Sequence, residues 1–137
     1  MSIQEINEDE AYMELNNIKK PIDELKSYVI KCVILGDSNV GKTSLVNYYL
    51  TNRMKNTETT LGAIFWLIDK QLDNGDLIKL NVWDTAGQER YNSLIPMYTR
   101  NSDIVILTFS LTDRASFNNL VKWKETTKYC TNLENLK

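Results

Sequence analysis

The chain has 137 residues, 42% of them apolar and 25% charged, with five glycines and two prolines. This composition is typical of one globular domain and excludes low-complexity and collagen-like proteins. The 16 basic and 18 acidic residues give a net charge of −2, which argues against a nucleic-acid partner. The chain has no histidine, which excludes a histidine-based site. It has only two cysteines, Cys32 and Cys130, and they are far apart, which argues against a disulfide scaffold.

Residues 1–27 are predicted to form an acidic N-terminal extension, because they hold seven acidic and three basic residues. Apolar residues from Ile3 to Ile18 follow a loose helical spacing, which Pro21 would end. The segment is interpreted either as a solvated, partly ordered arm or as a helix that binds a partner. Since it lacks the pattern of a signal peptide and no run of about 18 apolar residues occurs, we expect a cytoplasmic location.

The second predicted unit is a strand, a loop and a helix. Residues 28–35 form an apolar run of strand length that ends at Gly36, and residues 42–50 have helical spacing. Three apolar residues are expected on one face of this helix: Leu45, Val46 and Tyr49.

A hairpin, a further strand and a helix are predicted next. Residues 63–72 and 77–83 are β-rich and flank an Asn74-Gly75 pair, a strong signal for two antiparallel strands. Residues 104–109 are predicted to be a strand buried on both faces. Ser116 is expected to cap a helix with Phe117, Leu120 and Val121 on its inner side. Buried strands with helices between them predict an α/β sheet.

The loop after the first strand carries a phosphate-binding pattern. Residues 36–43 read Gly-Asp-Ser-Asn-Val-Gly-Lys-Thr and fit G-x-x-x-x-G-K-[ST] between a strand and a helix. Glycines let backbone amides converge on an anion, the helix N-terminus adds positive potential, Lys42 would neutralise phosphate and Thr43 offers an oxygen for Mg²⁺. The simpler alternative is a glycine turn with a capping threonine. The expected binding residues are Gly36, Asp37, Ser38, Asn39, Val40, Gly41, Lys42, Thr43 and Ser44.

A second motif follows at the end of the 77–83 strand. Asp84 is expected at the strand tip, where an open α/β sheet binds its ligands, and residues 84–90 continue Asp-Thr-Ala-Gly-Gln-Glu-Arg. With residues 36–43, this segment resembles the small GTPases of the Ras superfamily. Residues 60–65, 98–103 and 112–117 narrow the resemblance to the Rab subfamily, over about residues 28–123.

The resemblance implies a P-loop NTPase fold, the small G-domain, with three layers and a mostly parallel central sheet. It implies that residues 28–137 form a truncated Rab-like G-domain without its last two strands and helices. It further implies a switch that binds GTP or GDP with Mg²⁺, hydrolyses GTP and acts in vesicle-mediated protein transport, peripherally on endomembranes.

Individual roles are implied by position. Lys42 would contact the terminal phosphates, Thr43 and Thr60 would bind Mg²⁺, and Asp84 would hold the ion through water. The amide of Gly87 would bond to the γ-phosphate, and Gln88 would orient the attacking water as the catalytic residue.

Partners are implied as well. GTPase-activating and exchange proteins are expected, because an arginine finger supplied by a partner contributes about 10³ to 10⁵ in rate. Phe65, Trp83 and Tyr98 match the aromatic triad that meets Rab effectors; the alternative for each residue taken alone is an ordinary core aromatic.

The chain also departs from the family. The guanine-reading Asn-Lys-x-Asp motif and the C-terminal cysteine for prenylation would lie beyond Lys137, so this chain is expected to lack that motif and a membrane anchor. Residues 104–109 would then form an unpaired apolar edge, which predicts weak stability, self-association or poor nucleotide retention. The alternative function is a non-catalytic interaction module with little nucleotide binding. An ATP-using enzyme is disfavoured by residues 84–88.

Overall fold

The computed structural model describes residues 20–54 and 56–127. The predicted helix between Ile3 and Ile18, and Cys130, lie outside the described residues. The elements in chain order are η1 (Ile22–Glu24), β1 (Ser27–Leu35), α2 (Lys42–Thr51), β2 (Ala63–Gln71), β3 (Leu77–Thr85), η2 (Glu89–Leu94), α3 (Ile95–Thr99), β4 (Ile104–Leu107), α4 (Arg114–Asn118) and α5 (Leu120–Thr127).

Four strands form one mixed sheet in the order β2-β3-β1-β4. β1 is parallel to β3 and to β4, and Cys32 is in register with Val82 on one side and Ile104 on the other. β2 and β3 are antiparallel, with Ile64 opposite Asp84. The predicted strands, the hairpin and the mainly parallel sheet are therefore confirmed, and they bring the carboxyl ends of β1 and β3 together at one end of the sheet.

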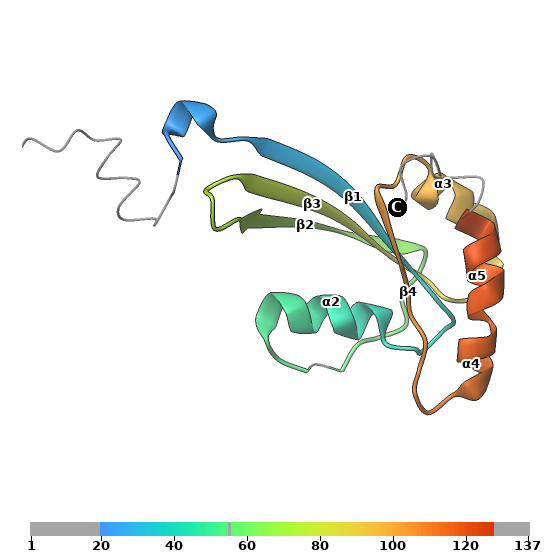
Figure 1. The fold of residues 1–137 in the computed structure, drawn as a ribbon. Coiled ribbons are helices and arrows are strands. Elements are labelled where there is room, and N and C mark those ends of the chain that lie inside the picture. Colours follow the sequence, from blue (N-terminus) through green and yellow to red (C-terminus); the bar gives the residue numbers. More distant parts are fainter. Residues whose placement is uncertain (1–19, 55, 128–137) are drawn as a thin grey trace, which may run out of the picture.

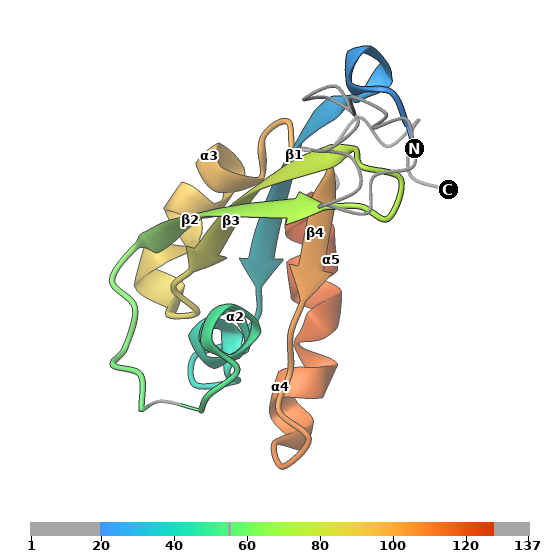
Figure 2. The same ribbon diagram turned by 90° about the vertical axis from the view of Figure 1, so that its left-hand side faces the viewer.

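The sheet lies between two helical layers (Figures 1 and 2), with α2 on one face and α3, α4 and α5 on the other. Alternating strand residues supply one core to each face. The core under α2 contains Cys32, Ile34, Val46, Ile68 and Val82. The core on the opposite face contains Val33, Leu35, Ile95, Tyr98 and Trp123. This three-layer arrangement is the predicted α/β fold. No helix in residues 20–54 or 56–127 has the length and apolar character needed to cross a bilayer.

The inner face of α2 differs from the prediction. Val46 is buried, but Leu45 and Tyr49 are 48% and 59% exposed. The buried residues of the helix are Lys42 and Val46, which lie one turn apart on the same face. The Lys42 side chain is held in the loop before the helix. We infer that this contact fixes the orientation of α2 about its axis, so that Leu45 and Tyr49 face the solvent.

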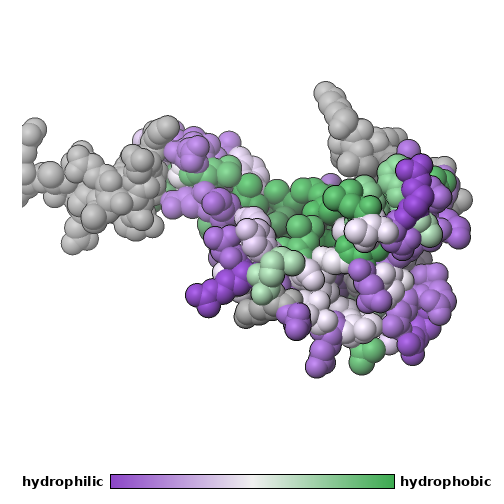
Figure 3. All heavy atoms as spheres, turned by 90° about the horizontal axis from the view of Figure 1, so that it is seen from below, coloured by the Kyte–Doolittle hydropathy of each residue, from purple (hydrophilic) through white to green (hydrophobic). Residues whose placement is uncertain are grey.

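β4 is the edge strand of the described sheet, as expected, but it is not buried on both faces. Val105 and Leu107 pack on the core under α5, whereas Ile104 and Ile106 on the α2 side are 42% and 38% exposed. The reason is that α2 packs through Val46 on β1, β2 and β3 residues and leaves β4 uncovered. Figure 3 shows apolar side chains gathered on this side of the molecule.

The last helical region also differs from the prediction. Asp113, not Ser116, is the N-cap, since its side chain accepts a hydrogen bond from the amide of Ala115. Ser116 is buried inside α4, where its hydroxyl accepts from the Ser110 amide at 3.0 Å and donates to the Asp113 carbonyl at 2.7 Å. Phe117 and Val121, expected inside, are 43% and 66% exposed, and Leu120 is half-buried.

The start of β1 is tied to the turn between β2 and β3. The Lys20 ammonium lies 2.9 Å from the Asp76 carboxylate, which also accepts from the Lys26 amide at 3.0 Å and from the Asn74 side chain. These bonds lower the pKa of Asp76, the Lys20 bond most of all. Asp76 therefore holds the first residues of the described chain at the end of the sheet opposite the strand tips.

Candidate phosphate-binding site

The loop of residues 36–43 lies between the end of β1 and the start of α2, as predicted. Gly41 is the N-cap of α2, has φ +94° and supplies no side-chain cap. A residue with a Cβ is strained in that conformation, so glycine is suited to this position. A helix start without a capping side chain presents free amide hydrogens, which is the arrangement that binds anions.

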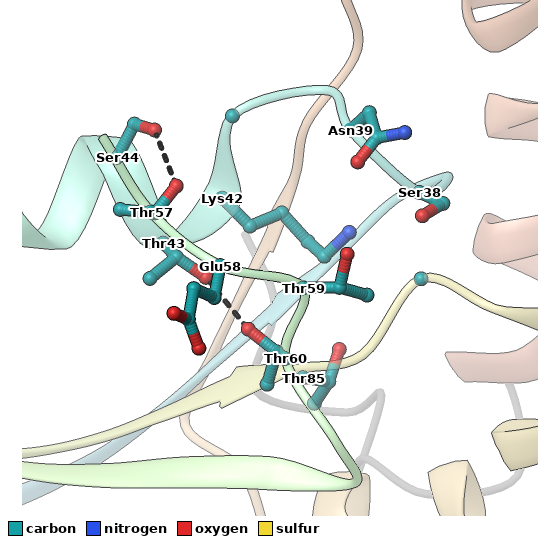
Figure 4. Close-up of a pocket in the computed structure, with 12 residues that line it drawn as sticks. Ser38, Asn39, Lys42, Thr43, Ser44, Thr57, Glu58, Thr59, Thr60 and Thr85 are labelled. Atoms are coloured by element: carbon teal, nitrogen blue, oxygen red, sulfur yellow. Dashed lines mark hydrogen bonds between the residues drawn. The ribbon is translucent and has the colours of Figure 1, made fainter.

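Lys42 is the buried cation of this loop. Its side chain is 6% exposed, and its ammonium donates to the carbonyls of Gly36 at 2.8 Å and Asp37 at 2.6 Å. Burial lowers the pKa of Lys42 to about 8, and the negative charges of Asp84 and Asp37 oppose this shift. Figure 4 shows the side chain extending between the segment with Ser38 and Asn39 and the segment with Thr59. The ammonium is thus placed for a ligand of negative charge.

Two threonine hydroxyls are in contact at the start of α2. Thr43, in the first turn of α2, lies 2.9 Å from Thr60, oxygen to oxygen (Figure 4). Ser44 contacts Thr57 in the same way at 3.3 Å. These contacts hold the 57–60 segment over the start of α2. Thr60, rather than Thr59, is the residue that joins Thr43.

Asp84 lies at the end of β3 beside these groups. It is fully buried, and neither carboxylate oxygen has a hydrogen-bond partner within the described residues. Burial raises the pKa of Asp84, and the nearby Thr43 hydroxyl and Lys42 ammonium oppose the rise. The Thr43 hydroxyl has its hydrogen-bonding contact with Thr60 instead. A buried carboxylate without a partner is costly, so this position needs a further group to satisfy it.

Gly87 brings the loop after β3 against the phosphate loop. A Cβ built on Gly87 would lie 2.3 Å from the Asp37 carbonyl carbon and 2.5 Å from the Lys42 ammonium nitrogen. Such separations are far shorter than a carbon contact allows. Gln88 follows as the N-cap of η2, and its side-chain oxygen is buried without a hydrogen-bond partner among the described residues. Gly87 therefore lies beside Lys42 and Asp37, and Gln88 is its neighbour in the chain.

One cavity collects most of the predicted binding residues. Val40, Gly36, Asp37 and Asp84 do not line it, although Lys42 contacts the carbonyls of Gly36 and Asp37. Within the described chain no cluster of three acidic, cysteine or histidine residues exists that could hold a metal alone. The residues that line the cavity are Ser38, Asn39, Gly41, Lys42, Thr43, Ser44, Thr57, Glu58, Thr59, Thr60, Thr85 and Gly87.

The three predicted aromatic residues are in contact. Ring centroids are 5.0 Å apart for Phe65 and Trp83, and 5.5 Å for Trp83 and Tyr98. Phe65 is 46% exposed, whereas Tyr98 is only 8% exposed and belongs to the core under α5. The cluster thus runs from the surface of β2 into the interior.

Sequence reasoning missed Asn119 and Trp123. The Asn119 amide and the Trp123 indole each donate to the Asp37 carboxylate at 2.7 Å. These residues are 82 and 86 positions from Asp37. No local pattern could indicate that contact. Ser116 in α4 and Trp123 in α5 are nevertheless seven residues apart and both buried, which is the spacing of residues on one helical face.

The fold and the loop together define the class of α/β proteins with a P-loop. The sequence model of the Ras family matches residues 31–137, and the chain belongs to this family. Its relatives include the human Ras-related protein Rab-9B, 45% identical over 101 residues, which is 73% of this chain and 50% of that protein. The dog Ras-related protein Rab-9A is 45% identical over 102 residues, with the same coverage.

A viral relative extends the comparison. The protein named "Probable Rab-related GTPase" of Acanthamoeba polyphaga mimivirus is 40% identical over 102 residues, which is 74% of this chain and 47% of that protein. The similarity is thus to small GTPases of the Rab type. The chain spans about half the length of the relatives it matches.

Proposed function

We propose that the chain forms the phosphate-binding and switch part of a Rab-type GTPase, which binds GTP or GDP with Mg²⁺ and hydrolyses GTP. The observation that carries this proposal is the buried, unpartnered Asp84 beside the Thr43–Thr60 pair. A glycine turn with a capping threonine would need neither of these features.

The residues present fit a magnesium ion. Mg²⁺ prefers octahedral oxygen ligands at about 2.0–2.1 Å, so two neighbouring ligands are about 2.9 Å apart. The Thr43 and Thr60 hydroxyl oxygens have this separation, and Asp84 supplies the negative charge behind them. Mg²⁺ bound there with the nucleotide would neutralise charge on the phosphate oxygens. Thr43 and Thr60 would hold it directly, and Asp84 through water.

The remaining groups serve the phosphates themselves. Lys42 donates charge-assisted hydrogen bonds to the terminal phosphates, while the free amides at the start of α2 surround them. Gly87 lies close to Lys42, and its amide would bond to the γ-phosphate. Gln88, the next residue, has a buried side-chain oxygen without a partner in the described part of the chain. It would orient the attacking water.

The switch would act through its surface. Phe65 lies in β2, which follows the Thr60 segment, and Trp83 lies in β3, which precedes the Gly87 loop. Tyr98 of α3 packs on Trp83. A change in either loop would alter the surface that an effector meets. Effectors, GTPase-activating and exchange proteins, endomembranes and vesicle transport are the partners and setting that we propose by analogy with the Rab relatives.

Direct titration tests the proposal. The 137-residue chain is mixed with fluorescent mant-GDP in Mg²⁺, and unlabelled GDP, GTP and ADP compete. We expect saturable binding that GDP and GTP displace. Lys42→Ala should weaken it about 100-fold or more, because it removes charge-assisted hydrogen bonds to phosphate. Lys70→Ala is the matched control, since Lys70 is exposed on β2 away from the loop.

Hydrolysis is measured separately by release of inorganic phosphate. Gln88→Leu should keep mant-GDP affinity and slow phosphate release about 100-fold, as expected for loss of a positioned water. A chain that binds no mant-GDP at micromolar concentration would refute the proposal and favour a non-catalytic interaction module. Equal loss of binding and hydrolysis in the Gln88 variant would contradict the role assigned to that residue.

A further inference from the structure

The phosphate loop contains a carboxylate that its own function does not need. Asp37 follows Gly36 directly, and its backbone carbonyl accepts from the Lys42 ammonium. Its side chain instead reaches the other helical layer, where both carboxylate oxygens are occupied. Oδ2 accepts from the Asn119 side-chain amide and Oδ1 from the Trp123 indole, each at 2.7 Å. Trp123 is 7% exposed and part of the core.

A free carboxylate in an anion-binding loop opposes its ligand. Nucleotide phosphates carry several negative charges, and repulsion between like charges several ångströms apart remains appreciable near a protein surface. The position of the side chain reduces this repulsion, although its charge still acts on the Lys42 ammonium. Asp37 does not line the cavity of Lys42, Thr43 and Thr60. It lines an adjoining cavity of about 480 Å³, which shares Ser38 and Gly87 with the first and is also lined by Asn119 and Trp123.

We propose that Asn119 and Trp123 are positioning residues for nucleotide binding, which hold the Asp37 carboxylate against α5 and away from the phosphates. Asp37 then contributes its backbone to the loop, while two neutral N–H donors satisfy both oxygens of its carboxylate. This inference rests on the proposed nucleotide site. It also makes α5 part of that site, because any shift of the helix moves the carboxylate.

The test releases the carboxylate and then removes it. Mant-GDP affinity in Mg²⁺ is measured for the 137-residue chain, for Asn119→Ala/Trp123→Phe, and for the same double variant with Asp37→Ala added. The double variant should bind about 5- to 20-fold more weakly, as expected for one uncompensated like charge near the phosphates. Removing that charge in the triple variant should restore affinity to within about threefold of the original chain.

The salt dependence of binding gives a second readout. If the contact of Asp37 with Asn119 and Trp123 were only a structural tether, the binding defect of the double variant would not depend on salt. Repulsion between exposed charges is screened as the Debye length falls, so the defect of the double variant should shrink between about 0.05 and 0.5 M salt. Trp66→Phe is the matched control for loss of an indole, since Trp66 Nε1 has no hydrogen-bond partner among the described residues. It should retain the affinity of the original chain.

The outcomes separate the two proposals. If the original chain binds no mant-GDP, the nucleotide site and this inference both fall. If it binds and the double variant binds equally well, only the inference is overturned. A double variant that stays weak after Asp37→Ala, or at high salt, would show that the contact is a structural tether. Should the double variant unfold by circular dichroism, Asn119→Ala with and without Asp37→Ala gives the same comparison.

Discussion

Replacing Gly87 by alanine should impair the closed arrangement of the two loops. A Cβ at this position would lie 2.3 Å from the carbonyl carbon and 2.4 Å from the carbonyl oxygen of Asp37, and 2.5 Å from the Lys42 nitrogen. Carbon contacts are ordinarily about 3.5 Å or more, so the overlap is about 1 Å against backbone atoms. Gly87 is not one of the glycines with a positive φ. The expected effect of the substitution is therefore a steric clash and not backbone strain.

The loop carrying Gly87 can relieve this overlap only by moving away from Asp37. Overpacking of this kind typically costs about 1–3 kcal/mol. If triphosphate binding needs the closed arrangement and diphosphate binding does not, the preference for triphosphate should fall about 5- to 150-fold.

The assay compares mant-GDP with a non-hydrolysable mant-labelled GTP analogue for the original chain and Gly87→Ala. Ser93→Ala, an exposed substitution in η2, is the control. An unchanged ratio of the two affinities in Gly87→Ala would refute the reasoning that Gly87 must approach Asp37 and Lys42 when triphosphate is bound.

Three further results are expected. Chelation of Mg²⁺ should speed mant-GDP release from the original chain, and an unchanged release rate would exclude the ion site. Asp84→Asn should raise the Mg²⁺ concentration needed for half-maximal binding. Because hydrogen bonding to Lys20 lowers the pKa of Asp76, that carboxylate stabilises the fold above about pH 4 and loses this effect as pH falls through its lowered pKa. Urea midpoints of the original chain and Asp76→Asn should therefore differ at pH 7 and converge in acid, once the pH is below that lowered pKa. A gap that is constant with pH would contradict the assigned bond. Finally, Ile106→Lys on the exposed side of β4 should reduce concentration-dependent association in light scattering, since charges on edge strands oppose pairing; equal association would rule out that surface.

Local sequence patterns predicted the elements that local chemistry determines. The apolar run of β1, the glycine-rich loop and the Asn74-Gly75 turn specify their conformations within a few residues. The rotation of each helix about its axis was harder to predict. Val46 of α2 faces inward because Lys42, one turn earlier, is buried. The burial of Lys42 depends on the loop before the helix and not on the apolar pattern.

Contacts between distant residues were beyond such reasoning. Asn119 and Trp123 reach Asp37 across more than 80 positions, and their role follows only from how α5 packs beside the loop. Similarly, the end of β3 indicated that Asp84 would be near the site. Only the structure shows that it is fully buried with no partner in the described part of the chain.

The bond between Lys20 and Asp76 has a practical consequence. β1 is nine residues long, so its two ends are separated by about 26 Å. The anchor at its beginning and the phosphate loop at its end therefore lie on opposite sides of the molecule (Figure 1). A fluorophore or surface tether attached at the exposed η1 turn would therefore lie far from the loop, so single-molecule or immobilised measurements of nucleotide exchange could use that end of the sheet.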